Sequence, residues 1–410
     1  MVRVLLLENV HPLAMQKLTD AGHTVESLSS SLSEDVLMKK LDEVDILGVR
    51  SSTQVSSTVL RNANHLLAIG CFCIGTNQVD LETAEELAIP VFNSPYANSR
   101  SVSELIIGQI IALSRQLGDR NIEMHTNRWQ KTSKNCHEIR GKTLGIIGYG
   151  HIGSQLSVLA ENLGMKVIYF DVVKKMAIGN AQSMPTMEAL LARSDFVSIH
   201  VPLLPSTQNL IGEREICQMK YGSYLLNASR GNVVVLEDVA TYLDRGHLLG
   251  FYADVFPIEP GTNGPIPTDS PISLLQNKKN VILTPHVGGA TEEAQEAIAD
   301  EVTDRLLDFL TKGATEGAVN FPQVNPPIKS KTCYRIVNIH HNISGVLRDL
   351  TKILEQYNIS YQLLATTTKL GIAVIDVDIE DRIRGEDEKE EDILSRVSFL
   401  DSNIKTRILI

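Results

Sequence analysis

The sequence predicts an α/β protein in which a doubly wound parallel sheet is followed by a smaller ferredoxin-like domain. Short apolar runs alternate with helix-length segments from the start of the chain to about residue 311. A glycine-rich segment, 148–153, stands between an apolar run and a helical segment, as in dinucleotide-binding domains. Residues 334–410 then follow the order β-α-β-β-α-β.

The first part of the chain predicts a parallel sheet with crossover helices. Strands are expected at 2–7, 45–49 and 66–70, and a helix at 13–21 ends at Gly22. A second series begins with a long helix at 101–117 and a polar stretch at 120–140. The strands expected after it are 143–148, 166–170, 196–201, 223–227, 248–253 and 280–284. Six strands separated by helix-length segments suit a doubly wound dinucleotide domain.

The remaining elements complete the chain. Residues 256–278 carry several prolines and glycines and predict an irregular loop, and a long helix is expected at 291–311. A proline-rich linker at 321–327 leads into the last domain. The strands expected in that domain are 334–339, 359–365, 371–379 and 404–410, with helices at 346–354 and around 390–398.

Length, charge and cysteine content limit the class of protein. With 410 residues, two or three domains are expected at about 150 residues each. The net charge of 38 − 49 = −11 argues against a general nucleic-acid or membrane-surface binder, because such proteins need a basic face. The first apolar run, 4–7, is too short for a signal peptide or a membrane span. Five cysteines without metal-ligand spacing favour a cytoplasmic protein with no metal site.

The glycine-rich segment has the spacing of a dinucleotide fingerprint. Gly148 provides the tight turn, Gly150 the close approach of a pyrophosphate, and Gly153 the close packing of helix on strand. Asp171 ends the next strand, 18 residues beyond the last glycine. A carboxylate there would bind both ribose hydroxyls and repel a 2′-phosphate, so NAD is favoured over NADP.

Three further segments place polar residues at predicted strand ends: 227–231, 254–260 and 284–289. They contain Arg230, Glu259 and His286. Oxidising an alcohol with NAD requires a base for the hydroxyl proton, and histidine titrates near neutrality. A carboxylate would fix its tautomer, and arginine could bind a substrate carboxylate through two hydrogen bonds. Each residue alone is more often structural, and the hypothesis depends on all three following strand ends in one domain.

These motifs resemble the D-2-hydroxyacid dehydrogenase family across residues 1–320. The resemblance rests on the fingerprint, on Ser-Asp-Phe-Val-Ser-Ile-His-Val-Pro at 194–202, on Asn-Ala-Ser-Arg-Gly at 227–231 and on Thr-Pro-His at 284–286. Residues 68–77 and 144–153 are most similar to the members that act on 3-phospho-D-glycerate and carry a C-terminal ACT domain.

The resemblance implies a fold, a reaction and a set of site residues. It implies a flavodoxin-like substrate domain from 1–97 and 286–326, an inserted NAD-binding Rossmann domain at 98–285, and an ACT regulatory domain at 334–410. The implied reaction is NAD-dependent oxidation of 3-phospho-D-glycerate to 3-phosphohydroxypyruvate, the first step of serine synthesis. Arg230, Glu259 and His286 would be catalytic. The implied NAD contacts, beyond the three fingerprint glycines, are His151, Ile152, Asp171, Ala228, Ser229, Arg230, Asp254, His286, Val287, Gly288 and Gly289.

The substrate phosphate requires cations, and the candidates follow the same resemblance. The expected substrate contacts are Arg50, Ser51, Gly75, Asn98, Arg100 and Lys131. Ser52 stands where related enzymes have a second arginine, and Ser29 where they have a lysine. Another D-2-hydroxy acid, with 2-oxoglutarate as the corresponding oxo acid, therefore remains an alternative. So does a non-catalytic, NAD-sensing protein like the transcriptional corepressors built on this fold.

The resemblance of the C-terminal domain to ACT modules implies amino-acid binding at a subunit interface. His340, Asn342, Gly345 and Asn358 match the serine-binding positions of that module. Serine feedback inhibition and a homotetramer are expected on this basis. Residues 343–345, Ile-Ser-Gly, replace the usual Arg-Pro-Gly, and a domain that only dimerises is the alternative.

Overall fold

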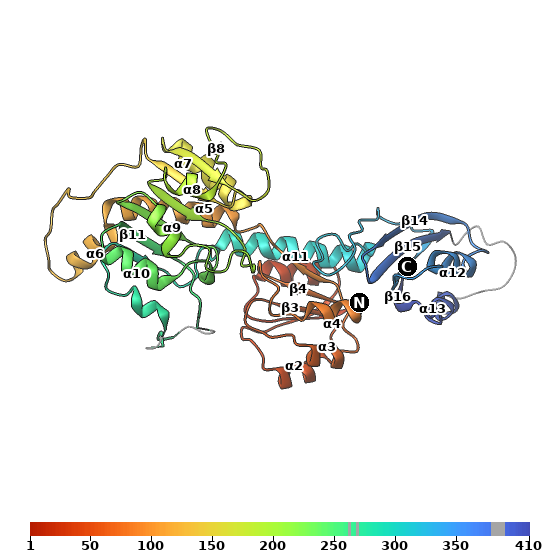
Figure 1. Ribbon diagram of the computed structural model, residues 1–410. Helices are drawn as coiled ribbons and strands as arrows, with labels where there is room; N and C mark the ends of the chain where they lie inside the picture. Colours follow the sequence, from red (N-terminus) through yellow and green to blue (C-terminus); the bar gives the residue numbers. More distant parts are fainter. Residues whose placement is uncertain (261–263, 268–269, 379–389) are drawn as a thin grey trace. The chain divides into compact units, whose positions relative to one another are not determined.

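The computed structural model describes residues 1–260, 264–267, 270–378 and 390–410, and the chain forms two compact units. The first unit combines Met1–Pro95 with Gln295–Ile410, and the second is Tyr96–Ala294. Figure 1 shows the helices and strands of both. Among the described residues, no helix combines the length and the apolar character that crossing a membrane requires.

The first unit contains a five-stranded parallel sheet with the flavodoxin-like order β2-β1-β3-β4-β5. The strands are β1 (Arg3–Leu6), β2 (Thr24–Ser27), β3 (Ile46–Val49), β4 (Ala68–Cys71) and β5 (Val91–Asn93). Its helices are α1 (Pro12–Asp20), α2 (Glu34–Leu41), α3 (Ser57–Asn62) and α4 (Leu81–Glu86). Sequence patterns did not predict β2 and β5, because β2 is a mostly exposed edge strand and β5 has only three residues.

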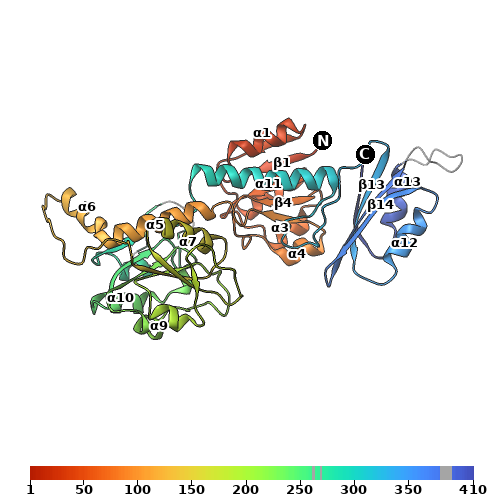
Figure 2. The same ribbon diagram turned by 90° about the horizontal axis from the view of Figure 1, so that it is seen from above.

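Helix α11 (Glu292–Lys312) returns the chain to this sheet. A side chain at Gly70 in β4 would come within 2.9 Å of Val302 and Leu306, so glycine allows the helix to pack closely on the strand. Figure 2 shows α1 beside α11, where Lys17 forms ion pairs with Asp300 and Asp304.

The second unit is built on a seven-stranded, entirely parallel sheet with the order β12-β11-β10-β9-β6-β7-β8. The strands are β6 (Thr143–Ile147), β7 (Lys166–Phe170), β8 (Gln182–Ser183), β9 (Phe196–Ile199), β10 (Ser223–Asn227), β11 (Leu248–Ala253) and β12 (Val281–Leu283). The helices are α5 (Ser99–Arg115), α6 (Leu117–His125), α7 (His151–Asn162), α8 (Met187–Leu191), α9 (Glu213–Gln218) and α10 (Leu236–Asp244). This confirms the predicted doubly wound sheet; the short, exposed strand β8 is additional.

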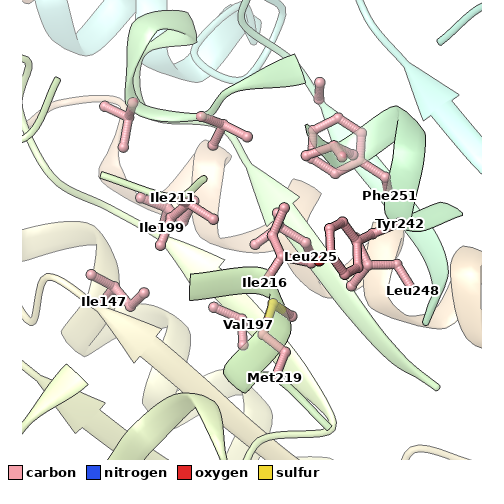
Figure 3. Packing of buried hydrophobic residues seen from close by; sticks show 14 of the residues in the cluster. Ile147, Val197, Ile199, Ile211, Ile216, Met219, Leu225, Tyr242, Leu248 and Phe251 are labelled. Atoms are coloured by element: carbon pink, nitrogen blue, oxygen red, sulfur yellow. The ribbon is translucent and has the colours of Figure 1, made fainter. Parts of the chain in front are cut away.

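The central strands of this sheet, β6, β9, β10 and β11, are buried on both faces, as parallel strands covered by helices must be. On one face, Val197, Ile199 and Leu225 pack against Ile216 of α9 and Tyr242 of α10 (Figure 3). On the other face, α5 and α7 cover the first strands of the sheet. The carboxyl ends of the strands are thereby held in fixed positions, and the predicted site residues follow them.

The C-terminal domain is a four-stranded antiparallel sheet with two helices on one face (Figure 1). Its elements are β13 (Cys333–His341), α12 (Val346–Ile353), β14 (Ile359–Thr366), β15 (Leu370–Asp378), α13 (Glu390–Ser398) and β16 (Asn403–Leu409). The strand order β14-β15-β13-β16 is the ferredoxin-like order. Ile336 and Ile375 pack under the helices against Leu350 and Val397.

The opposite face of that sheet carries buried charges. Arg335 is 0% exposed and pairs through two nitrogens with both carboxylate oxygens of Asp376, each at 2.6 Å. Its remaining nitrogen donates to the Lys312 and Pro327 carbonyl oxygens at 3.1 and 2.7 Å. Arg407 lies 4.0 Å above the Phe309 ring and donates to the Phe309 carbonyl oxygen. These contacts attach the sheet to the C-terminal end of α11.

Candidate active site

The loop between β6 and α7 can approach a ligand closely at one position. A Cβ at Gly148, whose φ is 91°, would lie 2.3 Å from the His200 carbonyl oxygen. A Cβ at Gly153 would lie 2.3 Å from the Gly148 carbonyl oxygen. Both glycines therefore allow the strand, loop and helix to pack together. Gly150 is different, because nothing lies within 4 Å of its Cβ position, which leaves open space beside the loop.

The N-terminus of α7 has donors for a phosphate group. This helix of 12 residues begins at His151, and its N-cap, Gly150, offers no side-chain cap. The first amide groups and the helix dipole therefore suit an anion. Asp171 stands at the end of β7, where its carboxylate oxygens accept hydrogen bonds from the Tyr149 and Val173 amides at 2.8 Å. These residues fit the pyrophosphate and ribose of NAD.

His286 and Glu259 are in direct contact. Nδ1 of His286 lies 2.7 Å from Oε2 of Glu259. The other carboxylate oxygen accepts a hydrogen bond from the Phe256 amide at 2.9 Å, which fixes the orientation of the glutamate. Because Nδ1 is engaged, Nε2 is the ring nitrogen that can exchange a proton with a substrate.

The contact changes the protonation of both groups. The hydrogen bond from His286 to Glu259 raises the pKa of His286, and partial burial opposes this rise. Burial alone would raise the pKa of Glu259, but the bonds from His286 and from the Phe256 amide, with the nearby charge of Arg230, lower it. The imidazolium is thus stabilised beside an ionised carboxylate.

A buried aspartate shapes the loop that carries His286. Asp254 is 1% exposed, and its carboxylate accepts hydrogen bonds from the Val287 and Gly288 amides at 2.9 and 2.7 Å and from the Thr284 hydroxyl. His286 adopts a φ of 53°, which a residue with a side chain rarely adopts. The loop is therefore held in a strained conformation that fixes the direction of the imidazole.

Arg230 is brought to the same place by the loop after β10. Asn227 accepts hydrogen bonds from the Ser229 amide and hydroxyl and donates to the Arg230 carbonyl oxygen at 3.0 Å. A Cβ at Gly231 would come within 1.9 Å of the Phe256 backbone, so this loop packs directly on the loop that leads to Glu259. Arg230 is close enough to influence the pKa of both His286 and Glu259. The three side chains thus form one cluster within the second unit.

The expected substrate contacts are divided between the two units. Arg50, Ser51 and Gly75 lie in the first unit, and Asn98, Arg100 and Lys131 lie in the second. Arg50 follows β3, and its loop is bound by Glu8, which accepts hydrogen bonds from the Arg50, Ser52 and Thr53 amides.

The three substrate candidates in the second unit differ in their surroundings. Asn98 is buried at the start of α5. Its Nδ2 lies against Gly289, and its Oδ1 has no hydrogen-bond partner among the described residues. Arg100 forms an exposed ion pair with Glu104. Lys131 lies in the exposed segment after α6.

The residues expected to bind serine are also divided, in this case between the two ends of the C-terminal sheet. His340 is buried, bonded through Nδ1 to Asn338 and packed on Gly371. Asn342 donates to the Thr367 carbonyl oxygen at 2.8 Å. Gly345, with a φ of 98°, caps α12 nearby. Asn358 instead lies beside Asp378 at the opposite end of β15.

Two residues that organise these sites were not among the expected site residues. Asn227 orients the arginine loop, and Glu8 binds the loop of Arg50. Asn227 ends a buried strand and Glu8 follows one, at the sheet edge where α/β proteins place polar groups. Asn227 belongs to a segment recognised in the sequence, but Glu8 has no such motif.

The chain is similar to a defined set of known proteins. Residues 107–288 match the family model described as D-isomer specific 2-hydroxyacid dehydrogenase, NAD binding domain. A D-3-phosphoglycerate dehydrogenase of Dictyostelium discoideum is 52% identical over 408 residues, which covers 100% of this chain and 97% of that protein. The D-3-phosphoglycerate dehydrogenase of Escherichia coli strain K12 is 43% identical, with 100% and 97% covered.

Solved structures are similar over about three quarters of the chain. The TT0316 protein of Thermus thermophilus has a TM-score of 0.68 at 29% identity, covering 75% of this chain and 96% of that one. D-Lactate dehydrogenase of Aquifex aeolicus, complexed with NAD and lactic acid, has a TM-score of 0.65 at 27% identity, covering 78% and 100%.

We expect a Glu259→Gln substitution to lower the pKa of His286. The amide still fills the space but carries no charge to stabilise the imidazolium, so the ring should lose its proton at a lower pH. An NMR titration of the His286 ring signals measures the change. Glu188→Gln, on an exposed glutamate of the same unit, serves as the control and should leave the titration unchanged. An unaltered His286 titration in Glu259→Gln would show that the contact does not hold in solution.

Proposed function

Because this chain belongs to the D-3-phosphoglycerate dehydrogenases of the D-isomer specific 2-hydroxyacid dehydrogenase family, we propose that it oxidises 3-phospho-D-glycerate to 3-phosphohydroxypyruvate. It is an NAD-dependent dehydrogenase, and NAD, when bound, accepts the hydride from C2 of the substrate. The reaction is the first step of serine biosynthesis.

One observation carries this function: Nδ1 of His286 lies 2.7 Å from Glu259, with Arg230 beside the pair, in the unit that holds the dinucleotide fingerprint. His286 takes the C2 hydroxyl proton on Nε2 as the alcohol becomes a carbonyl. Glu259 stabilises the imidazolium that forms. Arg230 binds the substrate carboxylate and the developing carbonyl oxygen.

The protonation state of His286 decides whether oxidation of the alcohol or reduction of the oxo acid is favoured at a given pH. Oxidation requires the neutral imidazole as base, and reduction requires the imidazolium as acid. Because Glu259 raises the pKa of His286, the imidazolium persists to a higher pH than in a free histidine. Oxidation therefore accelerates as the pH rises through that raised pKa, and reduction of the oxo acid slows.

The domain boundaries form part of the proposal. We assign the substrate domain to 1–97 and 286–326, the NAD domain to 98–285 and an ACT domain to 334–410. The compact units change over at residues 95 and 294, close to the first two boundaries. The ferredoxin-like strand order supports the third.

Serine as a feedback inhibitor is the regulatory part of the proposal. The amide of Asn342 and the imidazole of His340 lie at one end of the C-terminal sheet, and Asn358 lies at the other end. A serine site that uses all of them therefore requires two copies of the domain, with Asn358 supplied by the second copy. Neutral polar groups of this kind suit the carboxylate and hydroxyl of serine.

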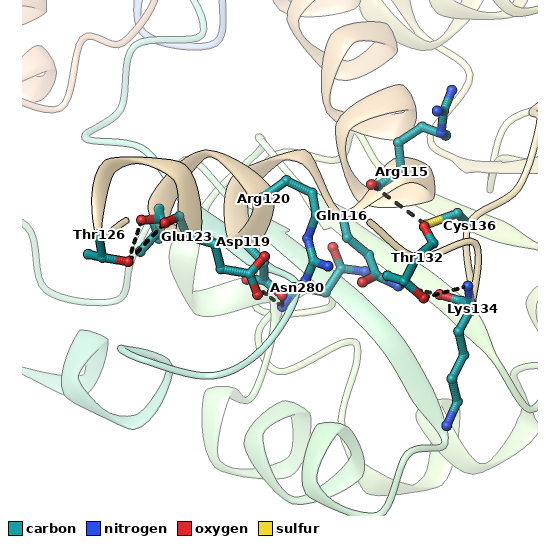
Figure 4. A network of polar contacts seen from close by, with 11 residues as sticks. Arg115, Gln116, Asp119, Arg120, Glu123, Thr126, Thr132, Lys134, Cys136 and Asn280 are labelled. Atoms are coloured by element: carbon teal, nitrogen blue, oxygen red, sulfur yellow. Dashed lines mark hydrogen bonds and ion pairs between the residues drawn. The ribbon is translucent and has the colours of Figure 1, made fainter. Parts of the chain in front are cut away.

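We further propose that the protein is a homotetramer, with the region around α6 as a second contact between copies. Ile122 and Met124 are exposed on α6, and Trp129 beyond it is 82% exposed. An open pocket of about 670 Å³ beside this region is lined by part of the polar network in Figure 4, including Arg120, which donates to Glu123. Two further Arg120 nitrogens and one Glu123 oxygen are buried without partners among the described residues. A partner surface would pair these atoms and cover the apolar side chains.

A cytoplasmic location completes the proposal. All five cysteines are free, as expected in a reducing compartment.

Turnover of 3-phosphoglycerate tests the reaction directly. NADH absorbance should rise when the protein is mixed with NAD⁺ and 3-phosphoglycerate, and His286→Asn should lower kcat by about 10²–10⁴-fold because it removes the base. His65→Asn, at an exposed histidine of the first unit, is the control. Full activity in His286→Asn, or no turnover in the unaltered protein, would contradict the assignment.

The substrate phosphate is tested by Arg50→Ala. We expect KM for 3-phosphoglycerate to rise about tenfold or more, because a charged hydrogen bond to the phosphate is lost. The KM of an unphosphorylated D-2-hydroxy acid should change little. Arg61→Ala, which removes an exposed arginine paired with Glu86, is the control. If Arg50→Ala leaves the KM for 3-phosphoglycerate unchanged, Arg50 does not hold the phosphate; the serines at 29 and 52 then favour an unphosphorylated substrate.

Serine inhibition is tested with Asn342→Ala. Millimolar serine should reduce turnover of the unaltered enzyme, and the variant should require roughly tenfold more serine for the same reduction, because one or two hydrogen bonds are lost. Asn358→Ala should behave in the same way. Asn62→Ala, on an exposed asparagine of α3, controls for general effects of the substitution. Equal serine sensitivity in Asn342→Ala and the unaltered enzyme would exclude this binding mode.

A further inference from the structure

An aromatic ring at the start of the second unit stacks on the first residue of the dinucleotide helix. The ring centroids of Tyr96 and His151 lie 3.6 Å apart, with an angle of 21° between the planes. Tyr96 is the first residue of the second unit, and His151 is the first residue of α7. The contact therefore joins the beginning of this unit to the N-terminus where the pyrophosphate of NAD would bind.

The stack does not contribute to a hydrophobic core. Tyr96 is 53% exposed, and His151 is also exposed. Among the described residues, no polar atom pairs with the Tyr96 hydroxyl, so the ring itself makes the contact. About half of the Tyr96 side chain is covered, it belongs to none of the buried clusters that the structure describes, and its ring contact is the stack on His151. Its effect is on the position of that imidazole.

Neighbouring contacts hold the ring in place. The Ser99 hydroxyl donates to the Tyr96 carbonyl oxygen at 2.7 Å, which fixes the backbone before α5. One turn later, the Ser103 hydroxyl lies 3.2 Å from the Ile152 carbonyl oxygen. Tyr96, just before α5, and Ser103, within α5, thus contact the first two residues of α7. These are the residues that stand beside the open space at Gly150.

We propose that Tyr96 is a positioning residue for the cofactor. Its ring holds the imidazole of His151 to one side of the helix N-terminus, so that the amide groups there remain accessible to the pyrophosphate. Without the ring, the imidazole rotates freely, and ordering it on cofactor binding costs entropy. This proposal depends on the NAD-binding function given above and assigns to it a residue outside the fingerprint.

Equilibrium binding of NADH and of ADP-ribose to the full-length protein tests the proposal. Tyr96→Leu keeps apolar bulk but removes the aromatic ring, and Tyr96→Phe keeps the ring but removes the hydroxyl. We expect Tyr96→Leu to raise both dissociation constants roughly two- to tenfold, the range expected for loss of an aromatic pair. Tyr96→Phe should bind like the unaltered protein. With NADH saturating, kcat should be nearly unchanged in both variants.

Two controls separate this role from a general structural one. Tyr221 is an exposed tyrosine of the same unit that contacts His247 edge-on, at a centroid distance of 5.8 Å. Tyr221→Leu should leave both dissociation constants unchanged. In the ligand-free protein, the ring protons of His151 should show an upfield NMR shift from the stacked ring, which Phe at position 96 keeps and Leu removes.

The binding results separate a failure of the NAD-binding function from a failure of the role given to Tyr96. Failure of the unaltered protein to bind NADH would overturn the NAD-binding function itself. Binding by Tyr96→Leu equal to that of the unaltered protein would overturn only the role of Tyr96. An effect on NADH but none on ADP-ribose would also overturn it, because the change would then lie at the nicotinamide rather than at the pyrophosphate. Weakening in both Leu and Phe variants would implicate the hydroxyl and contradict the stacking argument.

Discussion

The cluster of Arg230, Glu259 and His286 depends on one buried carboxylate. Asp254 has no ion-pair partner among the described residues, and backbone amides and a hydroxyl stabilise its charge instead. Hydrogen bonds from amides to a buried carboxylate are strong because water does not compete for them. They offset the strain of His286 at a positive φ, and this strained turn directs the imidazole toward Glu259.

Glycine residues allow the backbones of neighbouring loops and helices to approach closely, and this brings the other loops of the candidate site together. Gly231 lets the arginine loop touch the backbone at Phe256, and Gly153 lets α7 lie against the fingerprint loop. In each case a single Cβ would collide with main-chain atoms, which cannot move aside like a side chain. The chemistry of Arg230 and Glu259 is therefore placed by residues that have no side-chain chemistry themselves.

The C-terminal domain is attached through buried charged residues that stand among apolar ones. Val337, Ile339, Ile372 and Val374 lie on the same face of the sheet as Arg335 and are also buried. Arg335 satisfies its buried charge with Asp376 and with two carbonyl oxygens near the end of α11. Carbonyl groups at a helix C-terminus lack intrahelical partners and carry a partial negative charge, so arginines complement them. The attachment uses one face of the sheet, and the helices cover the other. The expected serine residues are left at the two ends of the sheet.

The sequence alone determined the fold class, because the period of apolar residues and the glycine spacing report local backbone geometry. It also singled out Arg230, Glu259 and His286 as candidate catalytic residues, since polar residues after buried strands converge at one sheet edge. It missed β2, β5 and β8, which are too short or too exposed to show a pattern. Only the tertiary structure decided the Arg335–Asp376 pair, the Tyr96–His151 stack and the separation of Asn358 from His340. The pair and the stack bring together residues that are distant in the chain, whereas Asn358 and His340 are separated within one small domain. All three arrangements depend on strand order and helix packing, which no local sequence pattern encodes.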